Sequence, residues 1–251
     1  EAGNCVIVSR STGEKKVVSL ENIGETVKQA LIEARDDMFK KALENRNCLL
    51  KMSSKGIYTD EQEIASWSQS MAEYASHIYL MREEYIERLS RHAKLIMNDI
   101  SENLEELSLG YEADIPSGLR DRGAIKQEYV RVFSENLSRE CAAGVSLYGP
   151  HRDDVKICIN NVDARTYASQ GQQRSVVLSL KLAEGEVIRE LFGEYPVFLF
   201  DDVLSELDGK RRAYVLSGTS DKQVIITSCE PNYFMETEAK FILRGPSGDT
   251  V

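Results

Sequence analysis

The sequence has 251 residues, 42% of them hydrophobic and 29% charged, which is ordinary for a globular protein and enough for one large core or two small ones. No run approaches about 18 consecutive apolar residues, which argues against a membrane span, and the first residues do not resemble a signal peptide. The formal net charge is −10, so any contact with nucleic acid must use a local basic patch.

Five cysteines and three histidines are scattered along the chain, and no two cysteines form a C-x-x-C pair. Zinc sites need ligands at short, regular spacings, so we expect no structural metal site. Free thiols in a reducing compartment, the cytoplasm, are the favoured interpretation.

The first region, residues 1–34, is predicted to form a β-hairpin and the start of a helix. Two β-rich runs, Cys5–Val8 and Val17–Val18, flank a turn that contains Gly13. Apolar residues at spacings of three and four then predict a helix from about Glu21.

The second region, residues 35–115, contains no proline and is predicted to be almost wholly helical. An apolar series at alternating steps of three and four indicates a coiled-coil seam, formed by Ile64, Trp67, Met71, Tyr74, Ile78, Met81 and Tyr85. An irregular step to Leu89 follows, and the series continues through His92, Ile96, Ile100 and Leu104. Because Ser53–Gly56 interrupts the pattern, we expect two antiparallel helices joined there.

The third region, residues 116–251, begins at Pro116 and is predicted to be an α/β fold. Helices are expected at 120–139, 172–192 and 210–216, and strands at 155–159, 197–200 and 224–226. The alternation of strand and helix predicts a parallel sheet. The wholly apolar run at 197–200 predicts a strand buried on both faces.

Two carboxylates, Asp201 and Asp202, directly follow this apolar strand. Ligands of open parallel sheets bind at the carboxyl ends of the strands, and this pattern is the Walker B arrangement of P-loop nucleotidases. Asp201 is then the candidate Mg²⁺ ligand, and Asp202 the candidate carboxylate that orients or deprotonates the attacking water. The alternative is an acidic helix cap after a buried strand.

Two further motifs accompany this one. Ser205–Asp208 has the form of the D-loop of ABC-type ATPases, and Tyr167–Ser175, upstream, opens a long helix. Ser169 offers a hydroxyl, Gly171 allows close approach, and a helix N-terminus presents N–H groups to an anion, as a phosphate-sensing signature loop requires. A Ser/Gly helix cap without a ligand is the alternative, but the order and spacing of three motifs favour function.

Together these motifs resemble the RecF family of bacterial DNA-repair ATPases, which belong to the ABC/SMC-like class. The resemblance rests on Tyr148–Asp154, Ser169–Arg174, Leu178–Glu184, Phe200–Asp208 and, near the start of the helical region, Leu43–Lys51. It implies an α/β ABC-type ATPase head interrupted by an antiparallel coiled-coil arm. Residues 1–34 would be a partial head-lobe segment, 35–115 the arm, and 116–251 the head lobe with signature, Walker B and D-loop.

The resemblance also implies a recombination mediator in DNA repair and replication restart. Such a protein forms an ATP-dependent homodimer, hydrolyses ATP weakly with Mg²⁺, binds gapped DNA at single-strand/double-strand junctions, and works with RecR and RecO. By motif, Asp201 is the Mg²⁺-associated acid, Asp202 the catalytic carboxylate and Asp208 part of the D-loop. Ser169, Gln170, Gly171 and Gln172 would contact the γ-phosphate of ATP held by the opposite protomer, and Thr227 or Ser228 would occupy the switch position.

His151–Asp154 matches a further family motif, for which a fold-stabilising turn and a nucleotide or DNA contact are both open interpretations. Two basic faces are weak candidates for DNA contact because such faces are more often simply solvated. They consist of Arg120, Arg122, Lys126 and Arg131, and of Lys40, Lys41, Arg46 and Lys51.

The sequence departs from the family pattern because it lacks the motif of the phosphate-binding loop. No G-x-x-x-x-G-K-[ST] motif occurs in the 251 residues, and residues 1–34 do not match the segment expected before the arm. We therefore expect a truncated chain, a spliced or rebuilt sequence, or one half of an assembly, which does not bind ATP tightly by itself. Two alternatives stay open: an SMC- or Rad50-like head, whose arms run for hundreds of residues, and a non-hydrolysing module that binds repair partners through the arm.

Overall fold

The computed structural model describes residues 4–8, 15–19, 23–217 and 222–227, with side chains described from residue 36 onward except Glu206. The contacts divide the chain into two compact units. The first comprises Glu1–Tyr85 and Tyr111–Val155, and the second Ile86–Gly110 and Lys156–Val251. The functional division into 1–34, 35–115 and 116–251 stays a prediction.

The N-terminal hairpin is confirmed. Strands β1 (Asn4–Val8) and β2 (Lys15–Ser19) pair antiparallel, with Val6 opposite Val17. Helix α1 (Ile23–Ser54) follows, beginning two residues after the predicted start.

Helix α1 ends within the predicted break, and helix α2 (Glu61–Ile100) follows. Gly56 lies between them with φ +73, a left-handed conformation that glycine adopts at no steric cost. The prediction that residues 35–115 are almost wholly helical is wrong after residue 100. Glu102 and Asn103 both have positive φ, which ends the helix, and strand β3 (Leu107–Glu112) follows.

The buried face of α2 is broader than the predicted seam. Met81 and Tyr85 are 39% and 42% exposed, so the heptad series is wrong at these two positions. Buried residues recur instead every 11 positions, as in Ile64, Ala75, Ile86 and Met97. Eleven residues make three turns at about 3.67 residues per turn, close to the natural period of a helix. The prediction considered only large apolar residues, and the alanines in this face carry no strong hydrophobic signal. The full width of the face was therefore not predicted.

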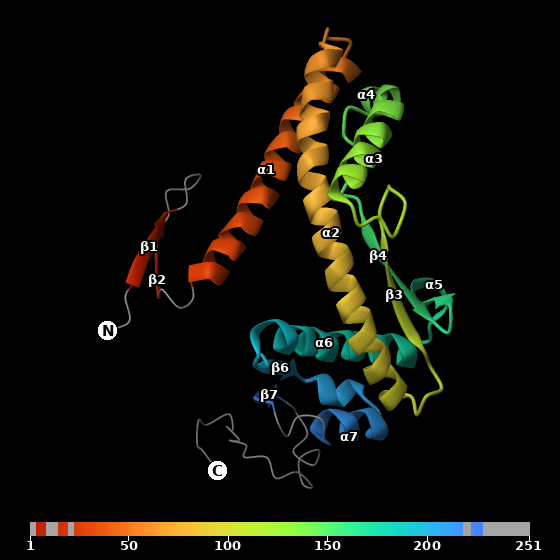
Figure 1. Ribbon diagram of the computed structural model, residues 1–251. Coiled ribbons are helices and arrows are strands. Elements are labelled where there is room, and N and C mark those ends of the chain that lie inside the picture. The colour runs from red at the N-terminus through yellow and green to blue at the C-terminus, as the bar shows by residue number, and fades with distance from the viewer. Residues whose placement is uncertain (1–3, 9–14, 20–22, 218–221, 228–251) are drawn as a thin grey trace, which may run out of the picture. The chain divides into compact units, whose positions relative to one another are not determined.

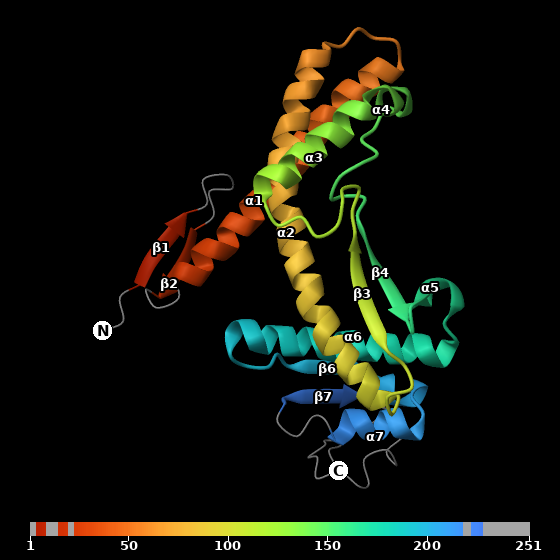
Figure 2. The same cartoon turned by 45° about the vertical axis from the view of Figure 1, so that its right-hand side comes forward.

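The first unit is a helical layer. The predicted helix at 120–139 is two helices, α3 (Arg122–Glu135) and α4 (Leu137–Ala143), which meet at Asn136. Figures 1 and 2 show α3 and α4 lying along α1 and the first half of α2. Their shared core includes Phe39 of α1, Met71 of α2, and the stacked rings of Tyr129 and Phe133 of α3.

A fully buried ion pair crosses this layer. Arg46 Nη2 lies 2.5 Å from Glu140 Oε2, and neither side chain is exposed to solvent. The other guanidinium nitrogens donate to hydroxyls, Nε to Ser68 at 2.8 Å and Nη1 to Ser146 at 2.7 Å. The second oxygen of Glu140 accepts from the backbone N–H of Leu147. Arg46 therefore cannot belong to a basic DNA-contacting face.

We predict that Glu140→Ala lowers the free energy of unfolding by about 3–5 kcal/mol, because it leaves a buried guanidinium without its counter-charge. Urea denaturation followed by circular dichroism measures this loss. The matched control is Glu135→Ala, which removes an exposed partner of Arg131 in the same unit and should change stability little. Equal losses in the two variants would contradict the assignment.

The second unit holds the α/β core. Strand β3 lies beside β4 (Asp154–Ile159), which pairs antiparallel with β5 (Val162–Asp163), and the short helix α5 (Ala164–Tyr167) follows. Then come α6 (Gln170–Phe192), β6 (Phe198–Asp201), a 3₁₀ turn η2 (Val203–Glu206), α7 (Gly209–Ser217) and β7 (Val224–Thr227). The predicted parallel pairing is confirmed for the strands at 197–200 and 224–226, because β6 and β7 pair parallel (Figure 1). It is wrong for the strand at 155–159, because β4 lies in a separate sheet and pairs antiparallel with β5.

Only one face of the β6–β7 pair is buried. Phe198 and Phe200 pack into the core with Leu178 and Leu182 of α6. Leu199 and Ile225, which are directly opposite each other, are 71% and 54% exposed. The prediction of a strand buried on both faces is therefore wrong in the described part of the chain, because the face of β6 that carries Leu199 has no described residues covering it as α6 covers Phe198 and Phe200. Among the described helices, none is long and apolar enough to cross a membrane.

Helix α6 approaches β6 closely at Gly185. A Cβ placed there would lie 2.2 Å from Cζ of Phe198, well inside van der Waals contact. The hydrogen side chain of Gly185 therefore sets the distance between helix and strand.

Gly185→Ala is expected to destabilise the chain by roughly 1–3 kcal/mol, because the ring of Phe198 must move within a packed core. Gly209→Ala, at the start of α7, is the control, since a Cβ there meets nothing within 4 Å. Thermal unfolding of the two variants should show a lower Tm for the first alone. An unchanged Tm for Gly185→Ala would refute the packing argument.

Candidate functional site

The carboxyl end of β6 brings three of the predicted site residues together. Asp201 is the last residue of the strand, and its Oδ1 accepts a hydrogen bond from Thr227 Oγ1 at 2.5 Å. Asp202 follows in the left-handed region, with φ +49. Its backbone N–H donates to both the carbonyl oxygen and the hydroxyl of Thr227, each at 3.1 Å. The parallel register, in which Asp201 lies opposite Thr227, makes these contacts possible.

The start of α6 is fixed by a capping box. Ser169 is the N-cap residue, and its Oγ accepts from the N–H of Gln172 at 3.2 Å. The side chain of Gln172 accepts in return from the N–H of Ser169 at 2.9 Å and donates to Glu105. The helix-cap interpretation of this loop is therefore correct for its local structure. Gly171, in the first turn, has open space at its Cα, since a Cβ would meet only Ser169 Oγ at 4.0 Å.

Asp208, which was predicted to belong to a D-loop, contacts Arg211 of α7. Its Oδ1 accepts from the backbone N–H of Arg211 at 2.9 Å, and its other oxygen pairs with the guanidinium of the same residue. These contacts hold the pKa of Asp208 below its usual value, the backbone hydrogen bond being the largest cause. Arg211 also donates from Nε to Ser175 Oγ on α6 at 2.6 Å. Asp208 and α6 are thus linked by one arginine.

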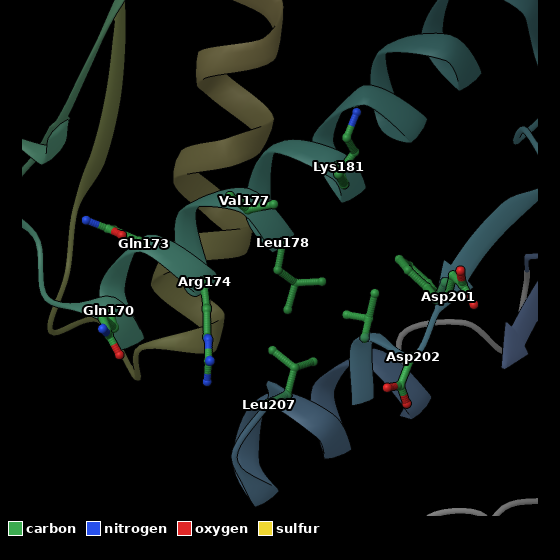
Figure 3. Close-up of a pocket in the computed structure, with 11 residues that line it drawn as sticks. Gln170, Gln173, Arg174, Val177, Leu178, Lys181, Asp201, Asp202 and Leu207 are labelled. Atoms are coloured by element: carbon green, nitrogen blue, oxygen red, sulfur yellow. The ribbon is translucent and has the colours of Figure 1, made fainter. Parts of the chain in front are cut away.

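A depression of about 640 Å³ lies between α6 and the end of β6. In Figure 3, Leu178 and Leu207 point toward each other between Arg174 on one side and Asp202 on the other. The residues that line it are Gln170, Gln173, Arg174, Val177, Leu178, Lys181, Phe200, Asp201, Asp202, Val203 and Leu207. Two basic side chains of α6 and two acidic side chains at the strand end therefore share one hollow.

Sequence reasoning did not single out Gln173, Arg174 or Lys181 as site residues. Their spacing from Gln170, at three, four and eleven positions, places them on one face of a helix. This helical periodicity is the sequence signal that could have identified them as site residues. The predicted switch residue Ser228 lies outside the described residues.

The motif His151–Asp154 belongs to the first unit and forms a turn. The N–H of Arg152 donates to the carbonyl oxygen of Gly149 at 2.8 Å, and Tyr111 Oη donates to Asp153 Oδ2. Burial raises the pKa of Asp153. These contacts support the interpretation of the motif as a fold-stabilising turn.

The predicted basic face near α3 is occupied by acidic partners. Arg122 and Lys126 both pair with Glu73, at 3.8 and 2.6 Å, while Arg120 pairs with Glu83 and Arg131 with Glu128 and Glu135. The positive charge of this face is largely neutralised by its own fold, so it gives no local support for contact with DNA.

The oxygen ligands present at the end of β6 fit Mg²⁺. Within the part of the chain that is described, no group of three or more His, Cys, Asp or Glu side chains could hold a metal ion. Asp201 and Asp202 offer two carboxylates, and Mg²⁺ in phosphate-handling sites is held by one or two carboxylates together with water and substrate phosphates. The two aspartates are thus a suitable protein contribution to such a site.

A parallel strand pair that ends in two aspartates, a capped helix in the signature position and a D-loop define an α/β fragment of an ABC-type ATPase head. No family model matches the chain. DNA replication and repair protein RecF of Clostridium kluyveri is 39% identical over 189 residues, 75% of this chain and 50% of that protein. The same protein of Staphylococcus carnosus is 41% identical over 192 residues, 76% of this chain and 52% of its own.

Solved structures agree. The recombination mediator protein RecF-ATPrS in the RecFOR pathway matches with a TM-score of 0.72 and 32% identity, over 80% of this chain and 54% of that one. The corresponding RecF-ATP structure matches with a TM-score of 0.71 and 31% identity. The chain belongs to the RecF family. It spans about half the length of the curated relatives that it matches.

The lowered pKa of Asp208 predicts a pH-dependent contribution to stability. A carboxyl with a depressed pKa stabilises the fold above its ordinary pKa, and this stabilisation is lost as the pH falls through the depressed value. Asp208→Asn keeps an oxygen that can accept from the N–H of Arg211 but removes the charge. We expect a lower Tm for the variant at about pH 7, and convergence with the parent chain once the pH has fallen below the depressed pKa of Asp208. Parallel Tm curves across this range would contradict the charge effect.

Proposed function

We propose that this chain supplies the signature, Walker B and D-loop part of a RecF-type ATPase head that binds ATP with Mg²⁺. The observation that carries the proposal is the hollow shared by the α6 face and the Asp201–Asp202 end of β6. In this assignment Asp201 holds the Mg²⁺, and Asp202 orients or deprotonates the attacking water. The metal, when bound, would neutralise phosphate charge, and the protein's contribution is to hold the two carboxylates in place.

The signature residues are assigned to the γ-phosphate of ATP bound to an opposite protomer. Ser169 Oγ accepts a hydrogen bond in the capping box, and a hydroxyl also has one proton to donate. The backbone N–H groups of Gln170 and Gly171 belong to the first turn, where a helix favours an anion, whereas the N–H of Gln172 already donates to Ser169 Oγ and Gln172 keeps its assignment by motif alone. The open space around Gly171 leaves room for the close approach of a ligand.

The exposed face of the β6–β7 pair supports incorporation into a larger head. Parallel sheets are normally covered on both faces, whereas Val197, Leu199 and Ile225 are at least half exposed. We assign this face to a polypeptide segment that carries the G-x-x-x-x-G-K-[ST] cradle. The chain would then require that segment to bind ATP tightly.

The wider role is proposed from the relatives. They are called DNA replication and repair proteins, and the matching structures are of a recombination mediator in the RecFOR pathway. We therefore propose DNA binding at single-strand gaps, partnership with RecR and RecO, an ATP-dependent homodimer, and a cytoplasmic location. The SMC- or Rad50-like alternative is less well supported, because the matches are to RecF.

Calorimetric titration of Mg²⁺-ATP tests the proposal. The chain is titrated alone and after mixing with the P-loop-bearing N-terminal half of a RecF relative. We expect binding in the mixture only, and its loss on Asp201→Ala in the same mixture. Unaltered binding by the Asp201→Ala mixture would overturn the role of that residue. Tight binding by the chain alone would show that its nucleotide site is built differently from the one proposed.

Circular dichroism checks that both polypeptides are folded, and sedimentation checks that they associate. If the mixture then still does not bind Mg²⁺-ATP, the result would favour the non-hydrolysing interaction module. A matched control is Glu106→Ala in the same unit, which removes an exposed carboxylate that pairs with Lys94 and is remote in sequence from the assigned motifs. That variant should bind Mg²⁺-ATP as the parent mixture does.

A further inference from the structure

Thr227 forms hydrogen bonds with both aspartates at the end of β6, so its hydroxyl is already engaged and is not free to contact a phosphate. A threonine hydroxyl has one proton, and that of Thr227 is donated to Asp201 Oδ1 across 2.5 Å. Thr227 Oγ1 also accepts a hydrogen bond from the N–H of Asp202, and so does the carbonyl oxygen of Thr227. One residue of β7 therefore contacts both carboxylate-bearing residues of the neighbouring strand.

The backbone of Asp202 explains what this arrangement achieves. A residue other than glycine is uncommon in the left-handed region, and although aspartate tolerates it better than most, surrounding contacts help to keep Asp202 there. The two acceptors on Thr227 provide such contacts at the N–H of Asp202. Ser205 adds another, because its hydroxyl donates to the carbonyl oxygen of Asp202 at 2.8 Å. The carboxylate of Asp202 is thereby attached to a backbone that is fixed at both its N–H and its carbonyl group.

We propose that Thr227 is the positioning residue of this site: its hydroxyl orients the carboxylate of Asp201 and holds the left-handed turn at Asp202. The inference rests on the proposed function for the identity of the ligand. It revises the predicted role of Thr227 at the switch position, since a proton donated to Asp201 is not available to a phosphate oxygen. Hydrogen bonds that orient metal-binding carboxylates typically change metal affinity by about 10- to 100-fold.

Three variants of the full chain test this proposal. Thr227→Val keeps the β-branched shape but removes the hydroxyl, and Thr227→Ser keeps the hydroxyl. Thr166→Val is the matched control, because it removes another threonine–aspartate hydrogen bond of 2.5 Å in the same unit, that between Thr166 and Asp163. Mn²⁺ alone is the probe, and its paramagnetic broadening of backbone NMR signals at the end of β6 reports binding.

We expect Thr227→Val to weaken Mn²⁺ binding at Asp201 by about 10- to 100-fold, and Thr227→Ser and Thr166→Val to change it little. Hydrogen exchange of the Asp202 amide should also accelerate in Thr227→Val, relative to the Phe200 amide in the same strand. Parent-like Mn²⁺ affinity and parent-like exchange in Thr227→Val would overturn the proposal. Should Thr227→Val fail to fold, the same two measurements on Thr227→Ala decide the question.

The two readouts separate this inference from the proposed function. If Mn²⁺ does not broaden signals near Asp201 even in the parent chain, the assignment of Asp201 as a metal ligand fails. Exchange at Asp202 would still decide the role of Thr227, since that measurement needs no ligand. Accelerated exchange in Thr227→Val with rescue by Thr227→Ser would support positioning, and unchanged exchange would refute it.

Discussion

The buried pair of Arg46 and Glu140 is the constraint on which the first unit depends. A guanidinium without any solvent exposure is tolerated only when counter-charge and hydrogen bonds replace water, and Arg46 finds these on α2, on α4 and on the residues after α4. Its partners are 22, 94 and 100 residues away in sequence, so the pair forms only when all these segments have assembled. Apolar packing of Phe39, Met71 and Phe133 holds the helices together but is compatible with several relative positions. The directional hydrogen bonds of a planar guanidinium select one of these positions.

In the second unit, a few hydrogen-bonding partners hold three aspartates in position. Asp201, Asp202 and Asp208 carry the charges that make the site resemble a nucleotide-handling centre, and each has an identified partner at its backbone or side chain. Thr227 contacts the first two and Arg211 the third. Arg211 also contacts Ser175 on α6, so a displacement of Asp208 must be accommodated by that helix. The positions of these carboxylates are thus set by neighbours that are not themselves acidic.

The sequence allowed prediction of what local patterns determine. The break at Ser53–Gly56, the β1–β2 hairpin and the parallel strand–helix–strand order were all predicted correctly, and so was the place of Asp201 at a strand end. Long-range partners were out of reach: nothing near Arg46 in the sequence indicates that it is buried. The face of α2 was misjudged because its alanines are small, and the division between α3 and α4 falls at Asn136, without proline or glycine. The exposed side of β6 was missed because four successive apolar residues give no alternation to distinguish its faces.

That exposed side also bears on how the chain behaves in solution. Leu199 and Ile225 form neighbouring apolar contacts on the surface of a two-stranded parallel pair, a surface of the kind on which proteins aggregate. A chain with such a face should self-associate increasingly as its concentration rises, and should be a substrate for chaperones while the face stays uncovered. A polypeptide that covers Leu199 and Ile225 would therefore reduce self-association, independently of any chemistry at the neighbouring aspartates.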